Sequence, residues 1–194
     1  MSATAIIILD RSGSMASAWD DTIGGLRNFV GKLHPATRVR FVDFDDAYTI
    51  HPETAAATFA LPAGIHPRGT TALLDAVGRT LSAALAEITS GRHVSVLILT
   101  DGAENASREV KRDDVVSLVA RAQERGWLVS FLGANVAAFE EGQSLGVNAA
   151  TTVQYGAGKS GVAFEVACGW VDAYVGDKAP RQLSDQEREA LKSD

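Results

Sequence analysis

The feature that most constrains this chain is a run of five apolar residues, Ala5 to Leu9, that leads directly into Asp10. A continuous run rich in β-branched residues is typical of a strand buried on both faces of a parallel sheet. The stretch from Val94 to Leu99 has the same character and is soon followed by Asp101. Two buried strands that lead into carboxylates predict an α/β fold with both carboxylates at one edge of the sheet.

Patterns typical of helices and of strands alternate along the rest of the chain. The expected helices are Trp19 to Leu33, Ala72 to Thr89, Asp113 to Gly126, a short helix ending near Gly142, and Gly161 to Val175. The further expected strands are Arg38 to Phe44, Tyr48 to Ile50, Trp127 to Leu132, and Ala149 to Val153. This alternation predicts a mostly parallel sheet with right-handed crossovers and helices on both faces.

Two segments depart from the alternation. Asp45, Asp46 and Ala47 separate two strand patterns so closely that we expect an antiparallel hairpin at one edge of the sheet. The segment from His51 to Arg68 contains three prolines and no regular period. We therefore expect an irregular surface connection that returns the chain to the edge carrying the carboxylates.

One domain of ordinary size accounts for a chain of 194 residues. We place this domain at residues 1–176 and treat residues 177–194 as a polar C-terminal tail. Within the tail, Ser184 and Glu187 have the spacing of a capping box. That spacing predicts a short terminal helix.

Charge and cysteine content limit the classes of partner. The net charge is −6 and the isoelectric point is near 5.2, which argues against nucleic acid and against an anionic membrane as partners. The single cysteine, Cys168, forms no disulfide within the chain. The opening segment resembles neither a signal peptide nor a membrane span. We therefore expect a cytoplasmic protein.

Oxygen-bearing side chains gather where the two acidic strand ends are expected to meet. Asp10, Ser12 and Ser14 alternate after the first strand, and Thr71 precedes a helix that follows a return to the same edge. The full set of oxygen ligands is Asp10, Ser12, Ser14, Thr71 and Asp101. A set of carboxylates and hydroxyls suits Mg²⁺, and Mn²⁺ and Ca²⁺ accept similar oxygens. Because hydroxyls are weak ligands, such a metal would gain from an Asp or Glu carboxylate of a partner protein.

Three motifs in this order, DRSGS, GTT before a helix and TDG after a strand, resemble the von Willebrand factor A (vWA) domain and its metal-ion-dependent adhesion site. The resemblance extends roughly from Thr4 to Val175. The longer strings DDTIGG, RGTTALLDA, TDGAENAS and FLGAN resemble small stand-alone bacterial members. The resemblance implies a three-layer, doubly wound, Rossmann-like fold with strand order 3-2-1-4-5-6, in which strand 3 is antiparallel.

The same resemblance implies roles for the matching residues. Asp10, Ser12 and Ser14 match the DxSxS motif. Thr71 matches the metal-binding threonine, although the adjacent Thr70 is an alternative. In the family the serines and the threonine bind the metal directly, the aspartates bind directly or through water, and a partner's acidic residue completes the shell. The aspartate of TDG is Asp101.

Other polar residues flank these motifs. We expect a partner-binding rim formed by Arg11, Thr70, Glu104 and Asn105, with an ordinary exposed loop as the alternative for Glu104 and Asn105. Asp43, Asp45, Asp46 and Asp75 are interpreted as structural, with Asp45 and Asp46 in a turn and Asp75 on a helix, and an extension of the metal site is the alternative.

The function expected from these patterns is a non-enzymatic, metal-dependent protein-binding module. Two alternatives remain open from the sequence. The first is a metal-assisted phosphoester hydrolase at the same site. The second is a scaffold with a degenerate metal site that binds through its helical faces or its tail. The sequence does not indicate an oligomeric state.

Overall fold

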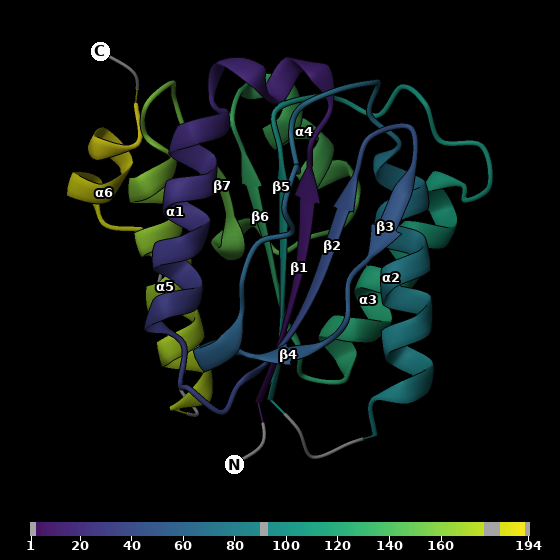
Figure 1. The fold of residues 1–194 in the computed structure, drawn as a ribbon, viewed down its shortest axis with the longest axis horizontal. Coiled ribbons are helices and arrows are strands. Elements are labelled where there is room, and N and C mark those ends of the chain that lie inside the picture. Colours follow the sequence, from purple (N-terminus) through teal and green to yellow (C-terminus); the bar gives the residue numbers. More distant parts are fainter. Residues whose placement is uncertain (1–2, 90–92, 177–182, 193–194) are drawn as a thin grey trace.

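A computed structural model describes residues 3–89, 93–176 and 183–192. In these residues seven strands form one sheet, in the order β3-β2-β1-β5-β6-β7, with β4 paired to β2 (Figure 1). The strands are β1 (Ala3–Asp10), β2 (Arg38–Phe44), β3 (Tyr48–Ile50), β4 (Thr54–Ala55), β5 (His93–Thr100), β6 (Leu128–Gly133) and β7 (Thr152–Gln154). The strand order and the antiparallel β2–β3 pair confirm the fold predicted from the sequence.

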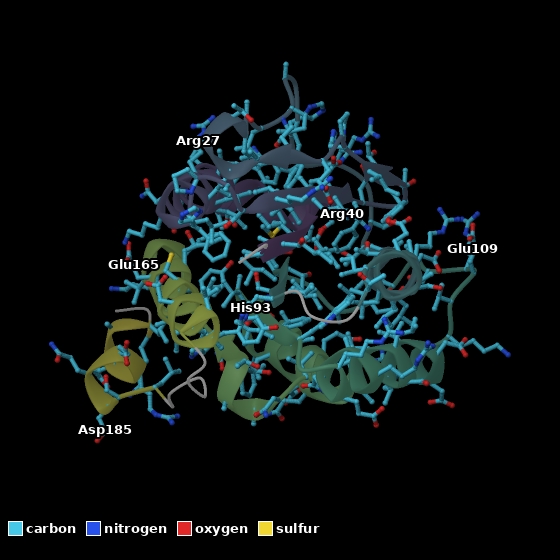
Figure 2. All side chains as sticks on the ribbon, turned by 90° about the horizontal axis from the view of Figure 1, so that it is seen from below. Arg27, Arg40, His93, Glu109, Glu165 and Asp185 are labelled. Atoms are coloured by element: carbon cyan, nitrogen blue, oxygen red, sulfur yellow. The ribbon has the colours of Figure 1, made fainter. Side chains whose placement is uncertain are left out.

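Helices cover both faces of the sheet. They are α1 (Trp19–Lys32), α2 (Leu73–Glu87), α3 (Arg112–Glu124), α4 (Val136–Ser144), α5 (Ser160–Val175) and α6 (Asp185–Ala190). One hydrophobic core lies between the sheet and α2 and α3, and the other lies between the sheet and α1 and α5. Figure 2 views these layers from below, with Glu165 of α5 on one side of the picture and Glu109 on the other.

The position of β1 in the middle of the sheet explains why its sequence does not alternate between apolar and polar residues. Ile6 and Ile8 enter the core beneath α2 and α3, while Ile7 and Leu9 enter the core beneath α1 and α5. All four side chains are fully buried. β1 also pairs in parallel with β2 on one side and β5 on the other. A strand in this position requires apolar residues on both of its faces.

Two details differ from the sequence-based expectation. Residues Ala149–Thr151 form a 3-10 helix, and only Thr152–Gln154 form the last strand. The Asn148 side chain accepts a hydrogen bond from the Ala150 amide at 2.9 Å, which starts that helical turn. The segment expected to be irregular contains β4 and a 3-10 helix, Ala56–Thr58. A strand of two residues is too short for a periodic signal.

The C-terminal tail contributes a helix that packs on the domain. Ser184 and Glu187 form the expected capping box at the start of α6. Leu191, just after the helix, is buried in the core beneath α1 and α5. The proposed boundary at residue 176 meets residues 177–182, which lie outside the described part of the chain. No helix among the described residues has the length and apolar character needed to cross a membrane.

Two adjacent glycines in α1 allow a test of the contact between α1 and α5. A Cβ at Gly25 would lie 2.8 Å from Cε2 of the buried Phe164, whereas a Cβ at Gly24 would meet nothing within 4 Å. We expect Gly25→Ala to destabilise the protein by about 1–3 kcal/mol through overpacking. Gly24→Ala should stabilise it by about 0.5–1 kcal/mol, because alanine favours a helix. Denaturant unfolding measures both values, and equal stability of the two variants would contradict the packing.

Candidate metal centre

The candidate site lies at the carboxyl end of the central strands. Asp10 ends β1, and Asp101 directly follows β5, which is the neighbour of β1 in the sheet. The 3-10 helix Gly13–Ser17, which carries Ser14, lies at this edge, toward which the arrow of β1 points in Figure 1. Parallel pairing therefore brings the DxSxS and TDG motifs together, as ligand sites in such sheets require.

The hydroxyl and carboxylate groups of the predicted ligands meet in space. The Ser14 hydroxyl donates to Oδ1 of Asp101 at 2.6 Å, and the Ser12 and Ser14 hydroxyl oxygens lie 3.1 Å apart. Gly102 borders the same space, because a Cβ there would lie 3.4 Å from Thr71 Oγ1 and 3.7 Å from Ser14 Oγ. Groups from three distant segments thus surround one small polar space.

Asp10 is the most buried member of the group. Its Oδ1 accepts the Ser12 amide at 2.7 Å, and its Oδ2 accepts the Thr100 hydroxyl at 2.5 Å. Burial raises the pKa of Asp10 to about 6, although these hydrogen bonds oppose the rise and the nearby Asp101 carboxylate adds to it. Burial also raises the pKa of Asp101, against the hydrogen bond from Ser14. A cation among these groups would offset the cost of ionising both carboxylates.

Thr71 is held in place by its backbone. Its amide donates to Oδ1 of Asn105 at 2.9 Å, and its carbonyl accepts the amides of Asn105 and Ala106. Thr71 is buried and its hydroxyl faces the space beside Gly102, whereas Thr70 is exposed. This placement brings Thr71 toward Ser14, and it leaves Thr70 on the outer rim.

Glu104 has a structural role in the loop after β5. One carboxylate oxygen accepts the amides of Ala106 and Ser107, and the other accepts the Leu74 amide at 2.8 Å. The second oxygen also accepts the Ser107 hydroxyl. Glu104 therefore caps the N-terminus of α2 from a distant loop, where a negative charge is favourable. A contact between Glu104 and a partner stays a prediction.

Arg11, another residue of the expected rim, lies in an ion-pair network. The residue is buried, its Nε contacts the Asp43 carboxylate, and its Nη2 lies 3.2 Å from Oδ2 of Asp45. Two buried carboxylates require a cation, and Arg11 supplies it. Of the four expected rim residues, Thr70 and Asn105 are exposed.

Thr100 is a member of the site that sequence reasoning missed. Its hydroxyl bonds both Asp10 and the backbone of Gly102, so it links the ends of β1 and β5. Thr100 is the threonine of the TDG motif, so the motif already contained it. Thr100 is also the last residue of β5 and is fully buried.

The donor set fits a hard divalent cation. Two carboxylates and three hydroxyls are oxygen donors of the kind that Mg²⁺, Mn²⁺ and Ca²⁺ prefer. The space beside Gly102, bordered by the Thr71 and Ser14 hydroxyls, would be filled by any side chain at that position. Within residues 3–89, 93–176 and 183–192, no three His, Cys, Asp or Glu side chains are grouped to hold a metal. A metal here would therefore depend on the hydroxyls.

Comparisons with known proteins identify the fold. No protein-family model and no curated protein matches the chain. The vWF domain of the type V pili tip protein Mfa5 from Porphyromonas gingivalis matches with a TM-score of 0.70 and 11% identity, covering 95% of this chain and 98% of that one. A von Willebrand factor type A structure from Catenulispora acidiphila matches with a TM-score of 0.59 and 15% identity, covering 88% and 42%.

A third match is proximal thread matrix protein 1 from the mussel byssus. It has a TM-score of 0.60 and 17% identity, and the match covers 86% of this chain. This chain spans 46% of the mussel protein and 42% of the Catenulispora protein. Solved vWA domains recur among the structural neighbours, and the chain has the vWA fold. At these identities the likeness concerns the fold alone.

Asp75 anchors the loop that follows the TDG motif. Its carboxylate accepts the amides of Arg108, Glu109 and Val110 at 2.8–3.0 Å. Burial opposes ionisation, but these three amides hold the pKa of Asp75 below its usual value. Asp75 thus acts as the structural residue that its position suggested.

We expect Asp75→Ala to destabilise the protein by about 1–3 kcal/mol at pH 7, because three amides lose their acceptor. Asp75→Asn keeps one acceptor oxygen and should therefore lose less stability than Asp75→Ala. The lowered pKa stabilises the fold above the unfolded value of 3.8, and that stabilisation is lost as the pH falls below it. Urea unfolding from pH 7 to pH 3 should therefore show the difference between wild type and Asp75→Ala shrinking. A constant difference would contradict this role.

Proposed function

We propose that this protein is a binding module that engages an Asp or Glu residue of a partner protein through a divalent cation, with Mg²⁺ as the first choice. The observation that supports the proposal most strongly is the meeting of hydroxyls and carboxylates from segments far apart in the sequence. Ser14 contacts Asp101 across 87 positions, and Thr71 borders the same space beside Gly102. The ligands we propose are Asp10, Ser12, Ser14, Thr71 and Asp101.

The proposed ligands differ in how firmly hydrogen bonds hold them before a metal binds. Both carboxylate oxygens of Asp10 already accept hydrogen bonds, so Asp10 orients the Ser12 amide and the Thr100 hydroxyl. Ser14 is exposed and its hydroxyl is free to exchange its bond to Asp101 for a metal. A bound Mg²⁺ would supply a hard Lewis acid with a position open to an anionic oxygen.

The partner's carboxylate would be attracted by the metal rather than by the helix N-terminus. The amides of Leu74 and Asp75 at the start of α2 are already bonded to Glu104 and Ser107. These bonds occupy groups that would otherwise attract an anion. A module that depends on the metal in this way binds its partner only when the metal is present, which makes chelation a direct test.

The proposal includes a cytoplasmic, non-enzymatic protein of the stand-alone bacterial kind. The single cysteine, Cys168, is a buried free thiol, which supports a location where thiols stay reduced. The motif strings that resemble small stand-alone bacterial vWA proteins support the assignment to that kind of protein. No observation in the described residues favours the hydrolase alternative over binding.

Adjacent threonines provide a matched test of metal binding. We expect Mg²⁺ to bind wild-type protein in isothermal titration and to raise its melting temperature. At a free Mg²⁺ concentration of about a hundred times Kd, the free energy of unfolding should rise by about 2.7 kcal/mol. Thr71→Val removes one ligand without changing the shape of the residue, and should weaken the affinity about tenfold or more. Thr70→Val removes an exposed hydroxyl and should leave the affinity unchanged.

The partner is tested with the ligand variant. A pull-down in Mg²⁺ should capture a protein that is lost in EDTA and with Thr71→Val. Absence of any heat or melting shift with Mg²⁺, Mn²⁺ and Ca²⁺ in the wild type would overturn the proposed function.

A further inference from the structure

A network of charged side chains lies next to the loops of the metal centre. Arg11, Asp43, Asp45 and Arg68 form it, and we call it the Arg–Asp network. Oδ2 of Asp45 receives Nε of Arg68 at 2.7 Å and lies 3.2 Å from Nη2 of Arg11. Asp43 contacts Arg11 and also faces His51. Arg11, Asp43 and Asp45 are buried, whereas the Arg68 side chain is 55% exposed.

The backbone around this network joins the two loops that carry the candidate hydroxyl ligands. Arg11 lies between Asp10 and Ser12, and its carbonyl accepts the Arg68 amide at 2.8 Å. The Gly13 amide donates to the Gly69 carbonyl at 3.1 Å. These bonds place the approach loop, residues 68–72, directly against the DxSxS loop.

Asp45 connects the same two loops to the turn between β2 and β3. Its carbonyl accepts the Ala72 amide at 2.9 Å, and its Oδ1 accepts the Ala47 amide at 2.6 Å. Burial opposes ionisation of Asp45, but Arg68, the Ala47 amide and Arg11 hold its pKa below the usual value. A charged Asp45 is therefore the junction between the turn, the DxSxS loop and the approach loop.

The approach loop fits against the turn so closely that one position requires glycine. Gly69 has a φ of +66°, and a Cβ there would lie 3.3 Å from the Asp45 Cβ and would overlap the Asp46 carboxylate. The next residues of the loop are Thr70 and Thr71. Any shift of the loop away from Asp45 would therefore move Thr71 relative to Ser12 and Ser14.

We propose that Arg68 is a positioning residue of the metal centre, whose ion pair with Asp45 holds the Thr71 loop against the DxSxS loop and thereby sets the metal affinity. This inference rests on the proposed function. A ligand that is correctly placed in only a fraction of molecules binds its metal with an apparent affinity reduced by that fraction. Arg68 contacts none of the proposed ligands through its side chain, so its influence is transmitted through Asp45.

Arg68 can be changed without leaving a buried charge alone. Asp45 would keep its pairing with Arg11 after Arg68 is removed. Removal of Arg11 would instead leave Asp43 and Asp45 without their shared buried cation, at a large cost to folding. Arg68→Met therefore tests the placement of the Thr71 loop while the fold is retained. Circular dichroism verifies the fold.

The sign of the effect separates positioning from simple electrostatics. Removing a positive charge near a cation site would by itself strengthen Mg²⁺ binding. We expect Arg68→Met to weaken it, by about tenfold in isothermal titration with MgCl₂. Arg108→Met removes an exposed charge from the loop after β5 and should leave the affinity unchanged or slightly stronger. The hydrogen-exchange rates of the Gly13 and Ala72 amides in metal-free protein should rise in Arg68→Met and should not rise in Arg108→Met.

A pair of glycines provides a second test with a matched control. Gly69 and Gly64 both have positive φ, but a Cβ at Gly64 would meet nothing within 4 Å. We expect Gly69→Ala to weaken Mg²⁺ binding because it pushes the loop away from Asp45. Gly64→Ala carries the same backbone strain and should bind Mg²⁺ as wild type does.

The outcomes distinguish the two proposals. Mg²⁺ binding by the wild type together with unchanged or tighter binding by Arg68→Met overturns the positioning role and leaves the proposed function standing. Weaker binding by Arg68→Met and Gly69→Ala, with Gly64→Ala unchanged and Arg108→Met unchanged or slightly tighter, supports the positioning role. A wild-type protein that binds no divalent cation overturns both.

Discussion

The parallel pairing of β1 with β5 is the constraint on which the candidate site depends. It places Asp10 and Asp101 at the same edge of the sheet, although 90 residues separate the two strand ends joined by the Thr100–Asp10 hydrogen bond. The pairing is held by side chains that are buried on both faces of β1. The same apolar run that makes β1 central therefore forces two carboxylates into a partly desolvated edge, where burial raises the pKa of each. That electrostatic cost is the physical reason to expect a cation.

Acidic residues have two distinct uses around this edge. Asp75 and Glu104 accept backbone amides, and they fasten the loop after β5 to the start of α2. Asp45 instead pairs with arginines and fastens the approach loop to the DxSxS loop. These carboxylates bond to backbone amides or arginines and lie outside the proposed set of metal ligands. The remaining pair, Asp10 and Asp101, lies among hydroxyls.

Local pattern was sufficient for much of the fold. The apolar run of β1, the turn at Asp45 to Ala47 and the capping box at Ser184 each act over a few residues, and each appears in the structure where it was expected. The failures came where geometry depends on distant partners. The β4 strand, Thr54–Ala55, exists only because β2 offers it backbone hydrogen bonds. Arg11, which resembles a surface residue in sequence, is drawn inward by two carboxylates.

The sequence by itself determined the type of fold, because periodicity and motif spacing are local properties of the chain. It also predicted five oxygen-bearing ligands at the edge of the sheet, but it missed the role of Thr100. Only the tertiary structure decided which of the polar residues face one another. Thr71 lies inside and Thr70 outside, because the Thr71 amide donates to Oδ1 of Asn105, and Glu104 caps α2 because its carboxylate accepts the Leu74 amide. Such bonds join loops about 30 residues apart, and their partners are chosen by how the sheet brings those loops together.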